Sequence, residues 1–227
     1  MNNYNTYSKI KNNEPVWNPV TQKLVYDSIV RRIDFTDQTI LDLGCGKGNL
    51  IDYLVANSIT PHYHVGVDII DPFLDIFINK NHYGGCNYTI IKDDFMRTGF
   101  FNDYDKRLIE CDYSLVLASL EIMETPSKGK HLIRVSDLMK NMWDYSRKGF
   151  VIATQSCWAE DQSDGSWYAN PLTLLEIIRQ KLTTNVYIDH TYAPHFFTLI
   201  ALKGKTEWEQ LGGKDKSALK EKRKGNR

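Results

Sequence analysis

TILDLGCGKGNL, residues 39–50, is the stretch that decides the fold of this chain. Apolar residues surround Asp42 and run directly into Gly44, Gly46 and Gly48, after which apolar residues at helical spacing resume. This pattern predicts a buried strand that turns sharply into a helix. Glycines allow unusual backbone angles and a close approach of the backbone to a ligand. We therefore expect a ligand-binding turn here.

Asp42, two residues before the first glycine, indicates which ligand the turn holds. The spacing G-x-G-x-G is by itself equally typical of an ordinary loop. A dinucleotide would place its pyrophosphate at the N-terminus of the helix, where a carboxylate would repel it, and its binders carry G-x-G-x-x-G. A carboxylate instead attracts the ammonium and sulfonium of S-adenosylmethionine. In these features the chain resembles the class I S-adenosylmethionine-dependent methyltransferases, whose first motif is an acid followed by this glycine turn.

The resemblance covers about residues 15–203 and implies a fold and a cofactor. The expected fold class is α/β, a doubly wound and mostly parallel seven-stranded sheet with an antiparallel seventh strand and helices on both faces. The expected cofactor is S-adenosylmethionine. Its contacts on the first turn would be Asp42, Gly44, Cys45, Gly46 and Gly48.

The run over residues 64–70 predicts the second strand, and Asp68 lies near its end. In doubly wound folds an acid at this place accepts hydrogen bonds from the two ribose hydroxyls. We expect that role for Asp68, with Ile69 beside the cofactor. Asp71, immediately before Pro72, is expected to cap the helix that follows.

Residues 88–92 predict the third strand, which leads into Asp93, Asp94 and Phe95. By resemblance, an acid here takes the exocyclic amine of the adenine and the next residue lies against the ring. We assign these roles to Asp94 and Phe95. Asp93 is the alternative acid, because sequence alone does not separate two adjacent carboxylates.

Residues 112–119 predict the fourth strand, whose end would meet the cofactor at Ala118 and Ser119. In the family, the methyl group meets its acceptor beside this strand end, so Glu121 is a candidate catalytic residue. Many members have Leu-Glu-His here, whereas Ile122 stands where the histidine would be. The chain lacks the Asn/Asp-Pro-Pro-Tyr and Pro-Cys motifs of DNA base methylation.

A polar loop and a hairpin are expected on the acceptor side. Residues 149–155 predict the fifth strand, and the loop 156–170, with two tryptophans, is expected to cover the substrate. A hairpin over residues 185–203 predicts the last two strands. Its His190 and His195 are candidates for a catalytic base, or each holds the turn structurally.

Helical spacing predicts further helices over residues 19–33, 49–57, 71–80, 131–143 and 171–182. Near the first of them, Trp17 and Tyr26 either cover the bound cofactor or pack the helix onto the core. The chain thus reads as one α/β domain.

The ends and the bulk composition bound the remaining possibilities. Residues 1–14 are expected to be a flexible segment and residues 204–227 a flexible charged tail. The chain of 227 residues has 28 Lys and Arg against 28 Asp and Glu, so its net charge favours no class of partner. No apolar run is long enough for a membrane span, and no signal peptide is seen. We expect a cytoplasmic protein without a metal site, since its four cysteines show no zinc-site spacing.

These features predict methyl transfer from S-adenosylmethionine to an oxygen or nitrogen of a small-molecule or glycan-like acceptor. One alternative is an RNA-modifying methyltransferase that uses the basic tail. Another is a cofactor-binding protein of the same fold without methyl transfer.

Overall fold

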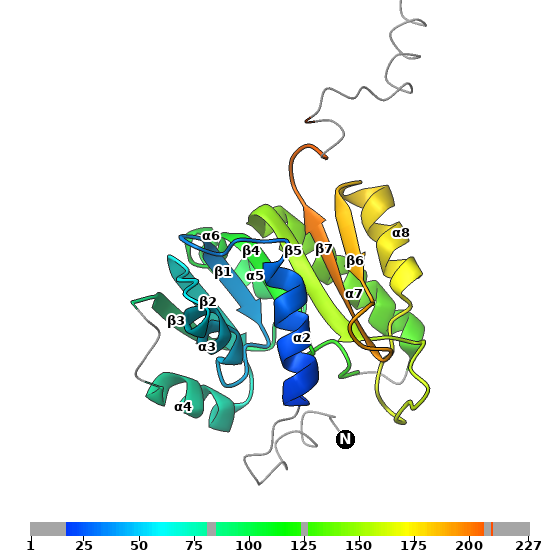
Figure 1. Cartoon of the computed structure of the whole chain (residues 1–227), viewed down its shortest axis with the longest axis horizontal. Helices are drawn as coiled ribbons and strands as arrows, with labels where there is room; N and C mark the ends of the chain where they lie inside the picture. The colour runs from blue at the N-terminus through cyan, green and yellow to red at the C-terminus, as the bar shows by residue number, and fades with distance from the viewer. Residues whose placement is uncertain (1–16, 81–84, 124–126, 207–209, 211–227) are drawn as a thin grey trace, which may run out of the picture.

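Seven strands form one sheet in the order β3-β2-β1-β4-β5-β7-β6 (Figure 1). The structure is a computed structural model that describes residues 17–80, 85–123, 127–206 and 210. The strands are β1 (Thr39–Leu43), β2 (Tyr63–Asp68), β3 (Asn87–Lys92), β4 (Cys111–Leu117), β5 (Ser146–Gln155), β6 (Val186–Asp189) and β7 (Phe196–Leu202).

The strand directions confirm the predicted topology. β1 pairs in parallel with both β2 and β4, and β3 and β5 continue the parallel sheet on either side. β7 lies between β5 and β6 and is antiparallel to both. The carboxyl ends of β1 to β6 therefore share one edge of the sheet. The strand order reverses between β1 and β4, the point outside which doubly wound sheets bind their ligands.

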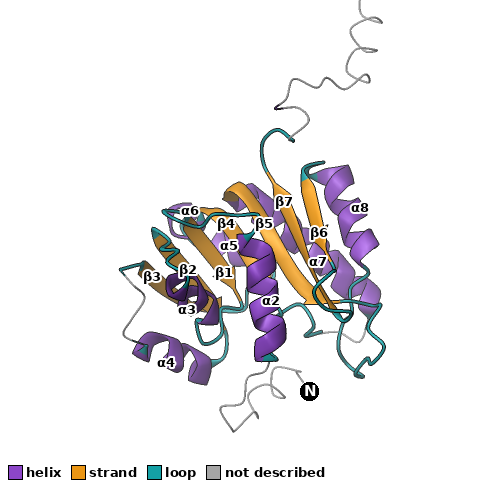
Figure 2. Cartoon of the chain, in the orientation of Figure 1, coloured by secondary structure: helices purple, strands orange, loops and turns teal. Residues whose placement is uncertain are grey.

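Helices cover both faces of the sheet (Figure 2). Their bounds are α2 (Pro19–Val30), α3 (Asn49–Ala56), α4 (Asp71–Asn79), α5 (Phe100–Asp103), α6 (Lys106–Ile109), α7 (Lys128–Tyr145) and α8 (Pro171–Lys181). Buried side chains of α5 to α8 form one core with Leu41 and Leu43, whereas those of α2 and α3 form another with Ile40. Alternate residues of β1 thus face opposite layers, as the period of a strand requires.

Three local details differ from the expectations. Asp71 does not cap α4: the capping position is Ile70, and the Asp71 carboxylate pairs with Lys92. The helix predicted to reach residue 33 ends at Val30. α5 and α6, of four residues each, were not predicted because one turn is too short to show helical spacing.

The expected flexible segment 1–14 lies outside the described residues, as does most of the expected tail 204–227. No helix in the described part of the chain combines the length and the apolar character needed to cross a membrane.

Candidate functional site

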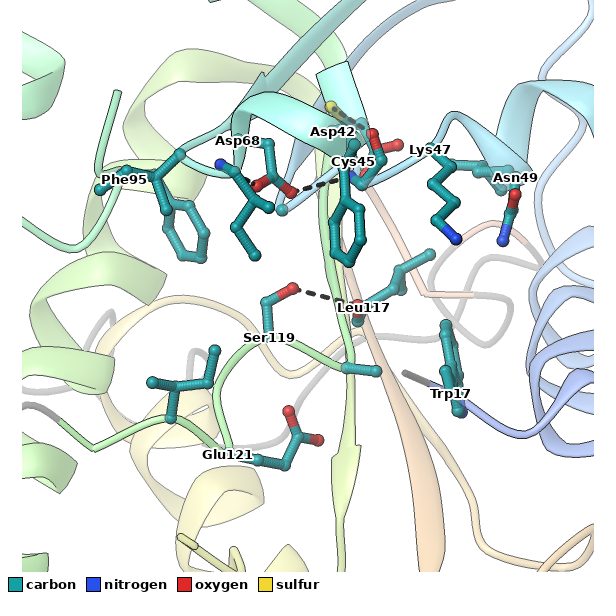
Figure 3. A pocket seen from close by; sticks show the side chains of 18 of the residues that line it. Trp17, Asp42, Cys45, Lys47, Asn49, Asp68, Phe95, Leu117, Ser119 and Glu121 are labelled. Atoms are coloured by element: carbon teal, nitrogen blue, oxygen red, sulfur yellow. Dashed lines mark hydrogen bonds between the residues drawn. The ribbon is translucent and has the colours of Figure 1, made fainter. Parts of the chain in front are cut away.

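A cavity of about 230 Å³ opens at the carboxyl ends of β1, β2, β4 and β5 (Figure 3). It lies at the point where the strand order reverses. Its lining includes the expected cofactor residues Asp42, Gly44, Cys45, Gly46, Asp68, Ile69, Asp93, Asp94, Phe95, Ala118 and Ser119. Glu121, Trp17 and Tyr26 also line it. Segments far apart in the sequence therefore meet in one site.

The three glycines of the first turn are required for different reasons, although all three have positive φ angles. A Cβ on Gly44 would lie 2.7 Å from Cβ of Ser119, and a Cβ on Gly48 would overlap the ring of Phe77. A Cβ on Gly46 would meet nothing within 4 Å. Gly48, which was expected to bind the cofactor, is outside the cavity lining and allows α3 to pack against α4.

The backbone N–H groups of this turn donate to acceptors within the protein. Those of Gly44 and Cys45 donate to the carbonyl of Val67, at 2.7 and 3.0 Å. The N–H of Gly46 donates to Oδ2 of Asp68 at 2.8 Å, and that of Gly48 to the carbonyl of Cys45. An anion-binding loop directs such groups at its ligand. These four N–H groups are thus already paired without an anion.

Asp42 and Asp68 are both buried at the floor of the cavity. Oδ1 of Asp68 accepts from the N–H of Ile70 at 2.9 Å, and burial raises the pKa of this carboxyl. Oδ2 of Asp42 lies 3.3 Å from Nε2 of the buried His64. Nδ1 of His64 has no partner among the described residues, which fits the tautomer whose proton lies on Nε2. The buried His64 thus fixes the position of the Asp42 carboxylate.

The structure separates Asp93 from Asp94. The carboxylate of Asp93 accepts from the guanidinium of Arg97, at 2.6 to 3.0 Å, and from the Tyr104 hydroxyl at 2.8 Å. The hydrogen bonds from Arg97 lower the pKa of Asp93 to about 2. Oδ1 of Asp94 accepts from the N–H of Met96 at 2.8 Å. Asp93 is therefore committed to a structural ion pair.

Ala118, directly after β4, has a φ of 55°, which is strained for a residue with a side chain. Its N–H donates to the carbonyl of Ala153 in β5 at 2.8 Å. The next residue, Ser119, packs against Gly44. This turn places the residues after β4 in the cavity wall, and such strain clusters at functional sites.

Glu121 is 6% exposed and lines the cavity. Its Oε1 accepts from Oγ1 of Thr154 and from the N–H of Gln155, both at 3.0 Å. Its Oε2 is buried with no hydrogen-bond partner among the described residues. Burial raises the pKa of Glu121 to about 7. Figure 3 shows the carboxyl group turned toward the side of the cavity on which Ser119 lies.

Two further lining residues carry a buried polar atom that no described residue satisfies. They are Trp17, through its indole Nε1, and Gln155, through its Oε1. The Trp17 ring stacks on the Phe196 ring, with their centroids 5.4 Å apart, and meets the Tyr26 ring edge-on, with a centroid distance of 5.9 Å. Gln155 and Phe196 were not predicted from the sequence, although a polar residue that ends a buried strand at the ligand edge is a usable signal.

The structure does not bring His190 or His195 into the cavity lining. The ring of His190 meets that of the half-exposed Trp158 edge-on at 5.0 Å. His195 is exposed, and its Nε2 lies 3.5 Å from Oγ1 of Thr21. Of the loop 156–170, only Ser166 is among the lining residues. The loop is anchored to the site by the N–H of Trp167, which donates to the carbonyl of Glu121.

The cavity lining is rich in negative charge. It carries five carboxylates and one lysine, Lys47, whose Nζ lies 5.2 Å from the centre of the Phe73 ring. Within the described ranges, no group of His, Cys, Asp and Glu is arranged to hold a metal ion. The lining therefore suits a cationic or neutral ligand better than an anion.

Comparisons with known proteins agree with this geometry. No family model matches the chain. The chain is 24% identical over 167 residues to "Putative methyltransferase Rv1506c" of Mycobacterium tuberculosis, which covers 73% of this chain and 93% of that protein.

Two solved structures show the same fold. The magnesium protoporphyrin IX methyltransferase of Synechocystis PCC 6803, with bound SAH, has a TM-score of 0.60 and 13% identity, covering 88% of this chain and 94% of that one. The small RNA methyltransferase HEN1 has a TM-score of 0.60 and 16% identity, covering 82% of this chain and 27% of that one. The sheet and its helices thus have the architecture of class I methyltransferases.

Proposed function

We propose that the chain, which belongs to the class I family of S-adenosylmethionine-dependent methyltransferases, transfers the methyl group of S-adenosylmethionine to a nitrogen or oxygen atom of a small molecule. The observation that carries this proposal is the acid-rich cavity where the strand order reverses, beside a glycine turn whose N–H groups are paired within the protein. Such a cavity suits a ligand with an ammonium and a sulfonium group.

The residues present fit this cofactor. Asp68, at the end of β2, would accept from the ribose hydroxyls, since a carboxylate has lone pairs beyond its two backbone hydrogen bonds. Asp94 would accept from the adenine amine, because Asp93 is bound by Arg97, and Phe95 would lie against the ring. Asp42 would face the positive charge. When bound, the cofactor supplies a methyl carbon on a positively charged sulfur.

The protein's own chemical task is to position the acceptor and to take up its proton. Holding two reactants in line contributes a large share of the acceleration. Glu121 is the proton acceptor that the geometry favours, since it lines the cavity and its Oε2 has no partner in the described structure. Its pKa of about 7 suits a group that exchanges a proton near neutral pH.

No observation in the described structure favours the two alternatives. RNA modification was expected to use the basic tail, most of which lies outside the described residues. Inside the cavity, the carboxylates other than Asp93, which is paired with Arg97, would repel a phosphate backbone. A protein that only binds the cofactor would not need an unpartnered carboxylate in the wall.

Calorimetry with S-adenosylmethionine and S-adenosylhomocysteine tests the donor. We expect both to bind with a stoichiometry of one, while NAD, which carries a pyrophosphate, does not bind. Labelled methyl S-adenosylmethionine is then incubated with cell extract, and the label is followed into small molecules, glycans and RNA. The proposal is contradicted if neither compound binds, or if the label is recovered in RNA alone.

A further inference from the structure

The three unpartnered polar atoms of the cavity wall belong to Glu121, Gln155 and Trp17, which are linked in space by a chain of contacts. Gln155 donates its backbone N–H to Oε1 of Glu121 at 3.0 Å. Gln155 also pairs with Phe196 in the antiparallel ladder of β5 and β7. Phe196 in turn stacks on Trp17 at 5.4 Å. Glu121, Gln155, Phe196 and Trp17 therefore form one continuous wall, which we name the acceptor wall.

The acceptor wall lies away from the residues proposed to hold the cofactor. Figure 3 shows Glu121 and Trp17 across the cavity from Asp68 and Phe95. All of these residues line the same cavity. A cofactor held by Asp68 and Phe95 would therefore leave the acceptor wall to a second ligand.

The unpartnered atoms define what that ligand must offer. Oε2 of Glu121 and Oε1 of Gln155 accept hydrogen bonds, and Nε1 of Trp17 donates one. Buried polar groups without partners are costly, so a ligand that pairs them gains free energy on binding. The stacked rings of Trp17 and Phe196 offer a flat apolar surface beside these atoms.

Resting on the proposed methyl transfer, we propose that the acceptor wall takes an amine on a flat apolar group, so that the chain is an amine N-methyltransferase. An ammonium group can donate hydrogen bonds to both Glu121 and Gln155. After it gives one proton to Glu121, the neutral amine still has N–H groups to donate to Gln155. A hydroxyl that gives its only proton to Glu121 has none left for Gln155, whose oxygen would then face an oxyanion.

The step balances without a further reactant. The acceptor's ammonium loses a proton to the carboxylate of Glu121, and the lone pair thus freed on nitrogen forms a bond to the methyl carbon. The carbon–sulfur bond breaks and its electron pair stays on sulfur, giving S-adenosylhomocysteine and the protonated N-methylated form of the acceptor. The proton on Glu121 passes to water. The acceptor wall itself includes no cation, so a carboxylate or phosphate acceptor finds no counter-charge there.

Matched amines and alcohols test this proposal on the full chain. The pairs are benzylamine with benzyl alcohol, phenethylamine with 2-phenylethanol, and tryptamine with tryptophol, each titrated by NMR with saturating S-adenosylhomocysteine present. We expect at least one amine to bind about 10-fold more tightly than its alcohol, which is the affinity difference that a hydrogen bond to a charged group of about 1.4 kcal/mol produces.

The variant E121Q removes the charge and keeps the shape, so the preference for the amine should fall to about 2-fold or less. E176Q, at an exposed residue of α8 that pairs with Gln180, is the control and should keep the full preference. Q155M removes the second unpartnered acceptor and should weaken amine binding while leaving S-adenosylhomocysteine binding intact.

Equal binding of amine and alcohol in every pair, binding of no probe, or a preference that survives in E121Q would each overturn the amine proposal. S-adenosylhomocysteine binding separates the two levels of inference. If the wild-type chain binds it and the amine preference is absent, only the acceptor class fails. If the wild-type chain does not bind it, the proposed methyl transfer itself fails.

Discussion

Gly46 donates its backbone N–H to Oδ2 of Asp68 at 2.8 Å, which joins the glycine turn after β1 to the end of β2. The other carboxylate oxygen of Asp68 accepts from the N–H of Ile70. The carboxylate also lines the cavity. The residue that holds the shape of the first turn is thus the residue proposed to hold the ribose.

D68N should weaken both the fold and the cofactor site. An amide presents one oxygen and one N–H₂ where the turn needs two acceptors, so one backbone N–H loses its partner at a cost of about 1–3 kcal/mol. We expect a lower free energy of unfolding and about 30-fold weaker binding of S-adenosylhomocysteine by calorimetry. D75N, at an exposed residue of α4, should change neither quantity. Unchanged affinity in D68N would remove Asp68 from the site.

G44A should destabilise the chain more than G165A does. Both glycines have a φ of +82°, so both variants carry backbone strain of about 1–2 kcal/mol. A Cβ at residue 165 meets nothing within 4 Å, whereas a Cβ at residue 44 overlaps the side chain of Ser119. Overpacking of this kind costs about 1–3 kcal/mol more. Chemical denaturation measures both variants.

The double variant G44A/S119G provides the internal control for this clash. Removing the Ser119 side chain should recover the overpacking part of the loss and leave the backbone strain, so G44A/S119G should be more stable than the single losses predict by addition. Additive losses would show that the side chain of Ser119 is not what excludes a Cβ from residue 44.

D93N should lower the stability of the chain, whereas D94N should weaken cofactor binding. Asp93 is held by Arg97 and Tyr104, so D93N should lower the free energy of unfolding by about 1–2 kcal/mol, part of the ion pair being screened by solvent. Its folded pKa of about 2 is depressed, so this stabilisation is present above the ordinary pKa of 3.8 and is lost as the pH falls toward 2. D94N should mainly weaken cofactor binding. The reverse outcome would make Asp93 the adenine ligand.

Glu121 should give the stability of the chain a pH dependence of known sign. Burial raises its folded pKa from 4.5 to about 7, so between these values the folded state holds a proton that the unfolded state has lost. The free energy of unfolding should therefore fall as the pH rises from 4.5 through 7, by about 3 kcal/mol at most. E121Q should lack this component. The same pH slope in both proteins would contradict the raised pKa.

H190Q and H195Q test the expectation that a hairpin histidine acts as the base. Neither residue lines the cavity, so methyl transfer by each variant should stay within about 2-fold of the wild type, whereas E121Q should lose about 100-fold, the lower range for a general base. Turnover is measured with labelled cofactor and the acceptor identified from extract. A loss of about 100-fold in either histidine variant would show that a histidine of the hairpin acts as the base.

The local sequence determined the sheet and the residues proposed to hold the donor, because these depend on patterns within a few residues. Asp42 in β1 and the three spaced glycines that follow are contiguous in the sequence, so the strand and its turn could be predicted from the local pattern. The acids at the end of β2 and directly after β3 reach the cavity because parallel strands end at one edge. The positions of Asp42, Asp68 and Phe95 in the lining follow from this rule.

Only the tertiary structure decided which partners each side chain meets. Arg97 and Tyr104 donate hydrogen bonds to the Asp93 carboxylate. Trp17, far away in sequence, stacks on Phe196 beside Gln155 and Glu121. The same packing buries Glu121 and raises its pKa, and it leaves His190 and His195 outside the cavity lining. Trp17 and Phe196 lie more than a hundred positions apart in the sequence, and their contact depends on how helices and loops pack onto the sheet, which short-range spacing does not encode.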